Sequence, residues 1–426
     1  MAQAEPTENS AWGEWRAHWR IVLAAAAGVG VCSLHYYALG AFMLPLQEEF
    51  GWSRAEISSG LLMTSFGMLI AGPLFGTLAD RWSARKLALS GLALYCVALG
   101  LLGTVGSSLW SWYCAWAFLA LAQGVAGFVV WTLVVASAFN RHRGLALALT
   151  MAGTAMASTI APPLAHAIIA GFGWRVALWS LAAGGFLVAF PLAWRYFHDP
   201  RLQKGRPHAA PTSRPQLSGL TFPQACKTRQ FWQIIVSVAI MSCGVSALIV
   251  HLVPMLSDRG ATPARAAAMA AMIGPSMFAG RLLSGVLLDR FPGSVVAAAF
   301  LLAPAAACRL LLGFDGEGWH GFLVAGLAGF TAGAEVDLIA YIASRYFGMR
   351  SYGAIYGLFG GVFAFGSGLA PLLAGAVFDH AGSYAPILSM LTPVMLFASF
   401  LMLTLGRYAH QPAPKTGASP SAPLHI

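Results

Sequence analysis

The stretch GTLADRW at residues 76–82 returns 209 residues further along the chain as GVLLDRF at residues 285–291. The same separation relates Gly51 to Gly260 and Gly144 to Gly353, and APPLA at 161–165 to APLLA at 370–374. One constant offset over four separated segments predicts two structurally equivalent halves. Such repeats place a functional site at the interface between the halves.

The composition points to a membrane protein. Only 9% of the 426 residues are charged and 58% are hydrophobic, whereas a soluble globular protein carries about 25% charged residues. These values exclude a soluble enzyme, a disordered chain and a fibrous repeat. They indicate a polytopic protein whose residues face either the lipid bilayer or other helices.

The apolar runs set the expected fold. A spanning helix needs about 20 mostly apolar residues, and twelve runs meet this length: 20–46, 55–79, 87–106, 109–139, 144–171, 174–196, 231–256, 264–288, 294–313, 319–344, 352–378 and 384–406. We therefore expect an all-α polytopic membrane protein with twelve transmembrane helices in two pseudo-symmetric six-helix bundles. The expected segments are an N-terminal segment 1–19, bundles 20–196 and 231–407, a basic, Pro-rich linker 197–230 and a disordered tail 408–426.

The basic residues predict the orientation. With the N-terminus placed in the cytoplasm, 19 of the 25 Lys and Arg fall on cytoplasmic segments, four on the opposite side and two within helices. This distribution is the positive-inside signal. The net charge of +10 then belongs to cytoplasmic loops, so it does not indicate nucleic-acid binding. Both termini are predicted to be cytoplasmic, and an Ala/Gly-rich chain with few lysines is typical of a bacterial inner (plasma) membrane.

Cofactor, metal and nucleotide chemistry find no support in the sequence. Five of the six cysteines lie in apolar runs, and no two cysteines have metal-ligand spacing, so we expect small buried side chains. No Walker-type P-loop is present, so ATP is not expected to drive the protein directly. We expect no cofactor, no metal and no catalytic residues.

The repeated segment resembles the loop motif of the major facilitator superfamily, and the resemblance covers essentially the whole chain. GTLADRWSARK at 76–86 departs from the usual motif at Ser83 and Ala84. Within that family, FGWSRAEIS at 50–58 and YFGMR at 346–350 resemble the monocarboxylate and oxalate:formate branch. The resemblance implies a secondary transporter that works by alternating access.

A gating role follows from the same resemblance. It is implied for Asp80, Arg81 and Arg85 in the first half and for Asp289 and Arg290 in the second. Asp80 at a helix end could pair with a helix N-terminus or with Arg141 or Arg143, and so hold the cytoplasmic side shut. The alternative is a topological anchor with no switching role.

Four ionisable residues lie inside predicted spans, all in the second half: Arg281, Arg309, Glu335 and Asp337. Each costs roughly 2.5–3.5 kcal/mol on insertion scales, which makes it a functional hypothesis. Their counterparts 209 positions earlier are Gly72, Gly100, Ala126 and Phe128, none of them charged. The asymmetry favours substrate or ion chemistry over a role in the fold.

Depth along the helices suggests how these charges pair. Arg281 and Asp337 each lie eight residues from the predicted inner end of their helix, which places both about 12 Å from the cytoplasmic boundary. Arg309 and Glu335 lie somewhat higher. We therefore expect Asp337 to pair with Arg281 and Glu335 with Arg309, as proton-coupling groups or charge pairs. The alternative is two static buried ion pairs.

Arg281 has further support as a substrate ligand. GRLLSG at 280–285 resembles the segment where the monocarboxylate and oxalate branch places its carboxylate-binding arginine, and a guanidinium fork matches a carboxylate. Met277 stands one turn earlier, where monocarboxylate carriers have a proton-linked Asp. The first-helix Lys of those carriers falls near Tyr37, so the positive charge of that Lys is missing here. Dicarboxylates are therefore disfavoured relative to a monoanion or a neutral, aromatic or amphipathic molecule.

Other polar and aromatic residues are candidates for the pore. His35 and Tyr37 on the first helix could contact substrate, as could Trp131 on the fourth. Tyr341 lies one turn past Asp337 and could position it. His166 and His251 are expected to be packing residues.

The sequence thus predicts a secondary transporter for a small organic anion, with a monocarboxylate as the leading substrate class and H⁺ as the candidate coupling ion. The alternative is an exporter of a drug or natural product with the same fold. An intramembrane enzyme or a channel is disfavoured. No metal cluster or Ser/His pairing appears at comparable depth, and a channel would not need paired halves.

Overall fold

The computed structural model describes residues 11–81, 83–139, 142–198 and 219–406. All of its long elements are helices. In the first half they are α1 (Ala11–Val31), α2 (Leu34–Phe50), α3 (Arg54–Arg81), α4 (Ala84–Leu101), the 3-10 turn η1 (Leu102–Thr104), α5 (Leu109–Val125), α6 (Phe128–Ala138), α7 (Arg143–Phe172) and α8 (Trp174–Tyr196). In the second half they are α10 (Phe222–Cys226), α11 (Arg229–Ser257), α12 (Pro263–Ala270), α13 (Ile273–Arg290), α14 (Gly293–Leu312), α15 (His320–Phe347), α16 (Tyr352–Ala381) and α17 (Ala385–Leu403).

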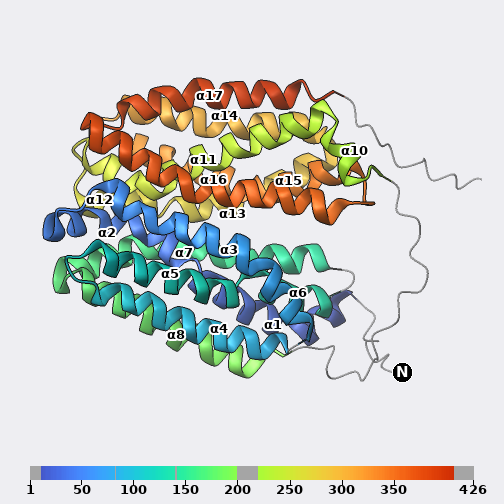
Figure 1. Ribbon diagram of the computed structural model, residues 1–426, viewed down its shortest axis with the longest axis horizontal. Helices are drawn as coiled ribbons and strands as arrows, with labels where there is room; N and C mark the ends of the chain where they lie inside the picture. The colour runs from blue at the N-terminus through green and yellow to red at the C-terminus, as the bar shows by residue number, and fades with distance from the viewer. Residues whose placement is uncertain (1–10, 82, 140–141, 199–218, 407–426) are drawn as a thin grey trace, which may run out of the picture.

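Two bundles lie side by side, with α1 to α8 in one and α11 to α17 in the other (Figure 1). Among the described residues, eleven helical stretches are long and apolar enough to cross a membrane. The one expected span outside this set is α3, which is a helix of 28 residues. The structure describes the side chains of α3 only as far as residue 67. The helical prediction is therefore confirmed. Residues 1–10, 199–218 and 407–426, which hold most of the predicted linker and tail, lie outside the described residues.

Three predicted spans are each built from two helices. The first run is α1 and α2 with a turn at Cys32–Ser33, the fourth is α5 and α6, and the eighth is α12 and α13. The prolines Pro162, Pro163 and Pro371 do not end their helices, because α7 and α16 continue through them. A proline inside a spanning helix is tolerated when neighbouring side chains satisfy the freed backbone groups.

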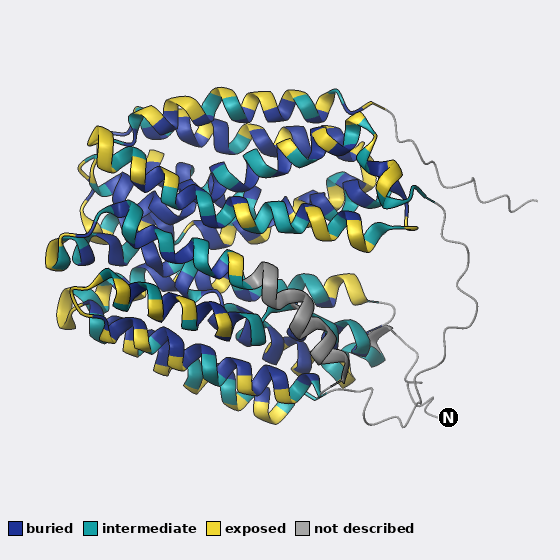
Figure 2. Cartoon of the chain, in the orientation of Figure 1, coloured by how far each residue is buried: buried dark blue, intermediate teal, exposed yellow. Residues whose placement is uncertain are grey.

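The two bundles contact each other through α2 with α11, α3 with α16, and α7 with α12 and α13. Glycines permit the closest approaches. A Cβ on Gly274 of α13 would lie 2.1 Å from the carbonyl oxygen of Ala155, and one on Gly375 of α16 would lie 2.5 Å from the backbone nitrogen of Ala55. The interior of the bundles is dark and the outer faces are exposed in Figure 2, as expected where outer faces meet lipid.

We name the two ends of the molecule by residues. The Arg54 end is formed by the turns at 51–53, 258–262 and 382–384 and lies on the left in Figure 1, near α12. The Arg290 end lies opposite, where α13 finishes.

Candidate functional site

Arg281 lies at the contact of α13 with α15. Its Nε donates to the carbonyl oxygen of Gly333 at 3.2 Å and stands 3.3 Å from Oδ2 of Asp337. The predicted contact between Arg281 and Asp337 is therefore present. Both Nη groups make no hydrogen bond to any residue that the structure describes, so the outer edge of the guanidinium is left for another acceptor. Two parallel N–H groups on that edge match the two oxygens of a carboxylate.

The close approach of α13 and α15 explains this geometry. A Cβ on Gly333 would lie 1.9 Å from the carbonyl oxygen of Met277, and one on Gly280 would lie 2.0 Å from that of Phe330. The two backbones are therefore nearly in contact. Only at this separation can the short reach of Arg281 Nε end on a carbonyl of the neighbouring helix.

Replacing Gly333 by alanine is expected to destabilise the protein by about 1–3 kcal/mol, because the added methyl forces α13 and α15 apart. The matched control is Gly360→Ala on α16, where a Cβ would meet nothing within 4 Å. That substitution should stabilise by about 0.5–1 kcal/mol, since a helical glycine is entropically costly. Thermal unfolding of the two purified variants checks the opposite signs. Equal effects would contradict the close packing at Gly333.

The first half contributes Tyr37 and Thr154 next to Arg281. The Tyr37 hydroxyl lies 3.8 Å from the sulfur of Met277, and Thr154 Oγ1 lies 3.5 Å from the same sulfur. Met277 precedes Arg281 by one turn of α13, and Tyr37 interacts electrostatically with Arg281. Residues of both halves therefore surround one site, and Tyr37 remains a candidate substrate contact.

Glu335 does not pair with Arg309, and that prediction is wrong. Glu335 is only 5% exposed and its Oε1 has no hydrogen-bond partner among the described residues, whereas Arg309 is exposed near the end of α14. Equal depth does not fix the direction in which a helix turns its side chains, and a long arginine near a helix end can extend toward water. Glu335 instead interacts electrostatically with Tyr36 and Tyr37 of α2.

Two other predicted pore residues serve packing. His35 Nδ1 lies 2.9 Å from the hydroxyl of Tyr95 inside the first bundle, and its ring packs against Trp116. Trp131 is fully buried and donates to the carbonyl of Ala126. Their burial in the bundle core removes both from the substrate candidates.

Tyr341 does not position Asp337. Its hydroxyl donates to the carbonyl of Leu288 at 3.2 Å and accepts from Arg345 Nε at the same distance. It therefore connects α15 to the last turn of α13 at the Arg290 end.

The predicted gating residues are only partly described. The side chains of Asp80 and Arg81 lie outside the described residues. Arg85 donates to the carbonyl of Trp194 at 2.5 Å within its own bundle, while Asp289 and Arg290 are exposed at the end of α13. The gating role of this group stays a prediction.

A larger cluster of ionic and polar contacts lies at the Arg54 end, and the sequence interpretation missed it. Arg54, at the first position of α3, is 3% exposed and forms a two-pronged ion pair with Asp258, with Nη1–Oδ2 at 2.5 Å and Nη2–Oδ1 at 2.8 Å. Arg54 Nη1 also donates to the hydroxyl of Tyr384 at 3.0 Å, and its guanidinium lies 3.7 Å from the ring centre of Phe378. Three helices of the second bundle are thereby joined to the first.

Asp379 completes this cluster by capping α3. Its two carboxylate oxygens accept hydrogen bonds from the backbone N–H groups of Arg54 at 3.0 Å and Ala55 at 2.9 Å. A carboxylate at a helix N-terminus satisfies free donors and opposes the helix dipole. We call Arg54, Asp258, Phe378, Asp379 and Tyr384 the Arg54 cluster. Its sequence signal was an acid at each of two span ends, Asp258 and Asp379, facing a lone arginine at a third.

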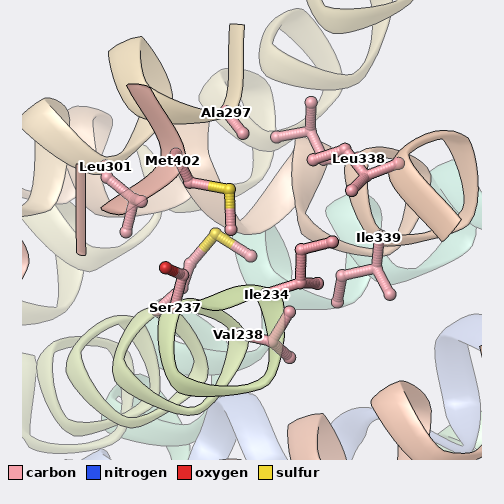
Figure 3. Close-up of a pocket in the computed structure, with 10 residues that line it drawn as sticks. Ile234, Ser237, Val238, Ala297, Leu301, Leu338, Ile339 and Met402 are labelled. Atoms are coloured by element: carbon pink, nitrogen blue, oxygen red, sulfur yellow. The ribbon is translucent and has the colours of Figure 1, made fainter. Parts of the chain in front are cut away.

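The enclosed pocket drawn in Figure 3 is not the substrate site. It lies inside the second bundle and is lined by apolar side chains from four helices, with Ser237 as the only polar one of the ten. The Ser237 hydroxyl already donates to the carbonyl of Ala398. Its free volume of about 10 Å³ is at most that of one water molecule.

A metal site finds no support in the part of the chain that the structure describes, since no three His, Cys, Asp or Glu side chains gather there.

Comparisons with known proteins agree on the class. Residues 25–371 match the family model described as Major Facilitator Superfamily. Monocarboxylate transporter 11 of Mus musculus is 26% identical over 414 residues, which cover 94% of this chain and 88% of that protein. Monocarboxylate transporter 13 of Bos taurus is 25% identical, with 97% and 93% covered. The chloramphenicol resistance protein of Streptomyces lividans is 28% identical over 57% of this chain and 60% of that protein.

Solved structures show the same fold. The nucleoside transporter NupG superposes with a TM-score of 0.72 at 11% identity, covering 91% of this chain and 99% of that one. A bacterial homolog of the human lysosomal transporter Spinster superposes with a TM-score of 0.65 at 16% identity, covering 92% and 95%.

Proposed function

This chain belongs to the major facilitator superfamily, and from that membership we propose that it carries a small monocarboxylate across the membrane by alternating access, together with H⁺. It is a multi-pass membrane transporter and not an enzyme. The observation that carries the substrate class is the open edge of the Arg281 guanidinium at the meeting of the two halves. The similarity to monocarboxylate transporters 11 and 13 supports the same class.

The charges around Arg281 favour a monoanion accompanied by a proton. Arg281 and Asp337 together are neutral, and an unpaired ionised carboxylate at the depth of Glu335 would be costly, so Glu335 counts as neutral in this balance. A bound monocarboxylate would leave one excess negative charge. A proton on Asp337 would cancel that charge and release Arg281 to the substrate. The Asp337 side chain is 46% exposed, compared with 13% for its partner Arg281.

The test is uptake into proteoliposomes of a panel of radiolabelled monocarboxylates, such as lactate and pyruvate. Uptake is measured with and without a pH gradient in which the outside is acidic and the inside is neutral. We expect at least one of them to accumulate only with the gradient. Protein-free liposomes measure passive entry of the undissociated acid. If no carboxylate accumulates or competes, the monocarboxylate proposal fails.

Asp337→Asn is expected to abolish accumulation driven by the pH gradient, because the amide cannot take up a proton. Exchange of internal for external substrate should remain, because the neutral amide leaves the positive charge of Arg281 free to bind the substrate. The comparison of gradient-driven uptake with exchange in one preparation measures this. A variant that still accumulates substrate along the gradient would remove Asp337 from the coupling mechanism.

A second candidate is an exporter of a drug or natural product. The similarity to the chloramphenicol resistance protein and to the MFS transporter asaE of Aspergillus flavus favours it, as do the aromatic side chains of Tyr36 and Tyr37 beside the site. The same proteoliposomes loaded with chloramphenicol distinguish the two functions. Export without any carboxylate transport would favour this second candidate.

The membrane orientation belongs to the proposal as well. We propose that both termini, the 197–230 linker and the Arg290 end face the cytoplasm of a bacterial inner membrane, with bundles at 20–196 and 231–407. The excess of Lys and Arg on these segments supports it. The Arg54 end would then face outward.

A further inference from the structure

The proline of α16 leaves backbone groups that α11 satisfies. Pro371 has no N–H, so the carbonyl of Ser367, four residues earlier, loses its helical donor. Ser246 of α11 donates to that carbonyl, with 2.5 Å between Oγ and O. His251, also on α11, lies with Nε2 2.8 Å from the carbonyl oxygen of Pro371 itself. Two side chains of one helix therefore hold the interrupted segment of another.

His251 also connects this segment to the Arg54 cluster. It is fully buried, and its Nδ1 lies 2.7 Å from the hydroxyl of Tyr384. A carbonyl cannot donate, so Nε2 carries the ring proton and Nδ1 accepts from Tyr384. Tyr384 in turn accepts from Arg54 Nη1 at 3.0 Å. Each group thus donates a hydrogen bond to the next, from Arg54 to Tyr384, from Tyr384 to His251 and from His251 to the carbonyl of Pro371.

The Tyr384 hydroxyl must be protonated for this series of hydrogen bonds to form. Burial raises the pKa of Tyr384, so the hydroxyl keeps its proton and donates it to His251. Ser58, on the same helix as Arg54, places its Oγ 3.2 Å from His251 Nε2 and adds a second contact from the first bundle.

The other end of the segment reaches the candidate substrate site. Ser246 lies on α11, which packs against α2, the helix that carries Tyr37 of the candidate substrate site. Two side chains of α11 therefore hold the stretch of α16 from Ser367 to Pro371. Ser246 holds it on the side of the substrate site, and His251, which is bonded to Tyr384 of the Arg54 cluster, holds it on the other side.

We propose that His251 is a positioning residue that ties closure of the Arg54 end to the shape of α16 at Pro371. When Arg54 leaves Asp258 and Tyr384, Tyr384 is no longer held in place against His251, and the Pro371 carbonyl that His251 holds becomes free to rearrange. Closure at this end and the conformation of α16 beside the substrate site then change as one event. This inference depends on alternating access and not on the identity of the substrate.

Pulsed electron spin resonance on the purified full chain in detergent, without ligand, tests the proposal. Spin labels at Glu48→Cys on α2 and Ala381→Cys on α16, both exposed at the Arg54 end, report the distance between the two bundles. The exposed Cys114 is replaced by alanine, and a sample without the two introduced cysteines measures labelling of the other five. The ratio of long-distance to short-distance populations is the readout.

His251→Leu and Tyr384→Phe should each raise the open-to-closed ratio about 3- to 10-fold, the effect of losing one net hydrogen bond. Tyr384→Phe keeps the ring beside Arg54 and removes only the hydroxyl, so it carries the test even if His251→Leu does not fold. Added to Arg54→Gln, neither substitution should raise the ratio further, because the connection is already broken.

Gln233→Leu is the matched control. Gln233 lies on α11, is buried like His251 and makes one side-chain hydrogen bond, to Thr404 at 3.0 Å, away from the Arg54 end. It should lower thermal stability without changing the ratio. The proposal is overturned if Tyr384→Phe leaves the ratio unchanged while Arg54→Gln raises it, or if the effects of Arg54→Gln and His251→Leu simply add.

Discussion

Replacing Arg281 by glutamine is expected to reduce carboxylate transport on the order of 100-fold or more. The variant loses two charge-assisted hydrogen bonds to the substrate, each contributing about 1.5–3 kcal/mol, and about 1.4 kcal/mol corresponds to a factor of ten in binding. It also leaves Asp337 beside the site without its counter-charge. The initial rate of uptake into proteoliposomes over a range of substrate concentrations measures the loss.

Two further arginine variants separate chemistry from fold. Arg281→Lys keeps the charge but not the planar fork, so it should recover only a minor part of the activity. Arg309→Gln removes the other intramembrane arginine, which is exposed on α14 and has no part in the site, so transport should be unchanged. Full transport by Arg281→Gln would end the substrate role of Arg281. An equal loss in Arg309→Gln would show that the assay responds to charge removal in general.

The contrast between these two arginines shows what the sequence could predict. The pairing of Arg281 with Asp337 followed from counting residues to the ends of two helices, because those ends are marked by charges at 289 and 345. Depth alone gave the wrong partner for Glu335. Which way a helix turns a side chain depends on packing with its neighbours, here the glycine contacts of α13 with α15, and no single-sequence count contains that information.

The prediction that His35 and Trp131 contact the substrate was wrong for a related reason. A polar or aromatic residue within a spanning helix can face the pore or the core of its own bundle, and composition does not distinguish the two. Both residues face the core. The Arg54 cluster was missed because its members come from the ends of four helices, with 330 residues of sequence between Arg54 and Tyr384. Contacts between the two halves form only when the tertiary fold is complete.

Replacing Arg54 by glutamine is expected to shift the Arg54 end strongly toward the open state. The change leaves Asp258 without its partner, and removing one member of a buried ion pair costs about 3–5 kcal/mol. Because the Asp258 side chain is 29% exposed, water screens part of that charge, so we expect the low end of this range. About 3 kcal/mol corresponds to a change of roughly 100-fold in the closed-to-open ratio. Spin labels at positions 48 and 381 measure that ratio directly.

A second ion pair provides the matched control. Arg175 and Glu49 form a 2.7 Å contact close to the Arg54 end, but both partners belong to the first bundle and their side chains are 37% and 40% exposed. An exposed pair contributes about 0–1 kcal/mol, and this one does not join the two halves. Arg175→Gln should therefore leave the closed-to-open ratio unchanged. If the two substitutions shift the ratio equally, general loss of surface charge explains the effect and Arg54 does not hold this end shut. If only Arg54→Gln shifts it, the ion pair across the two halves is what stabilises the closed state, and transport by that variant should slow at the step in which this end closes.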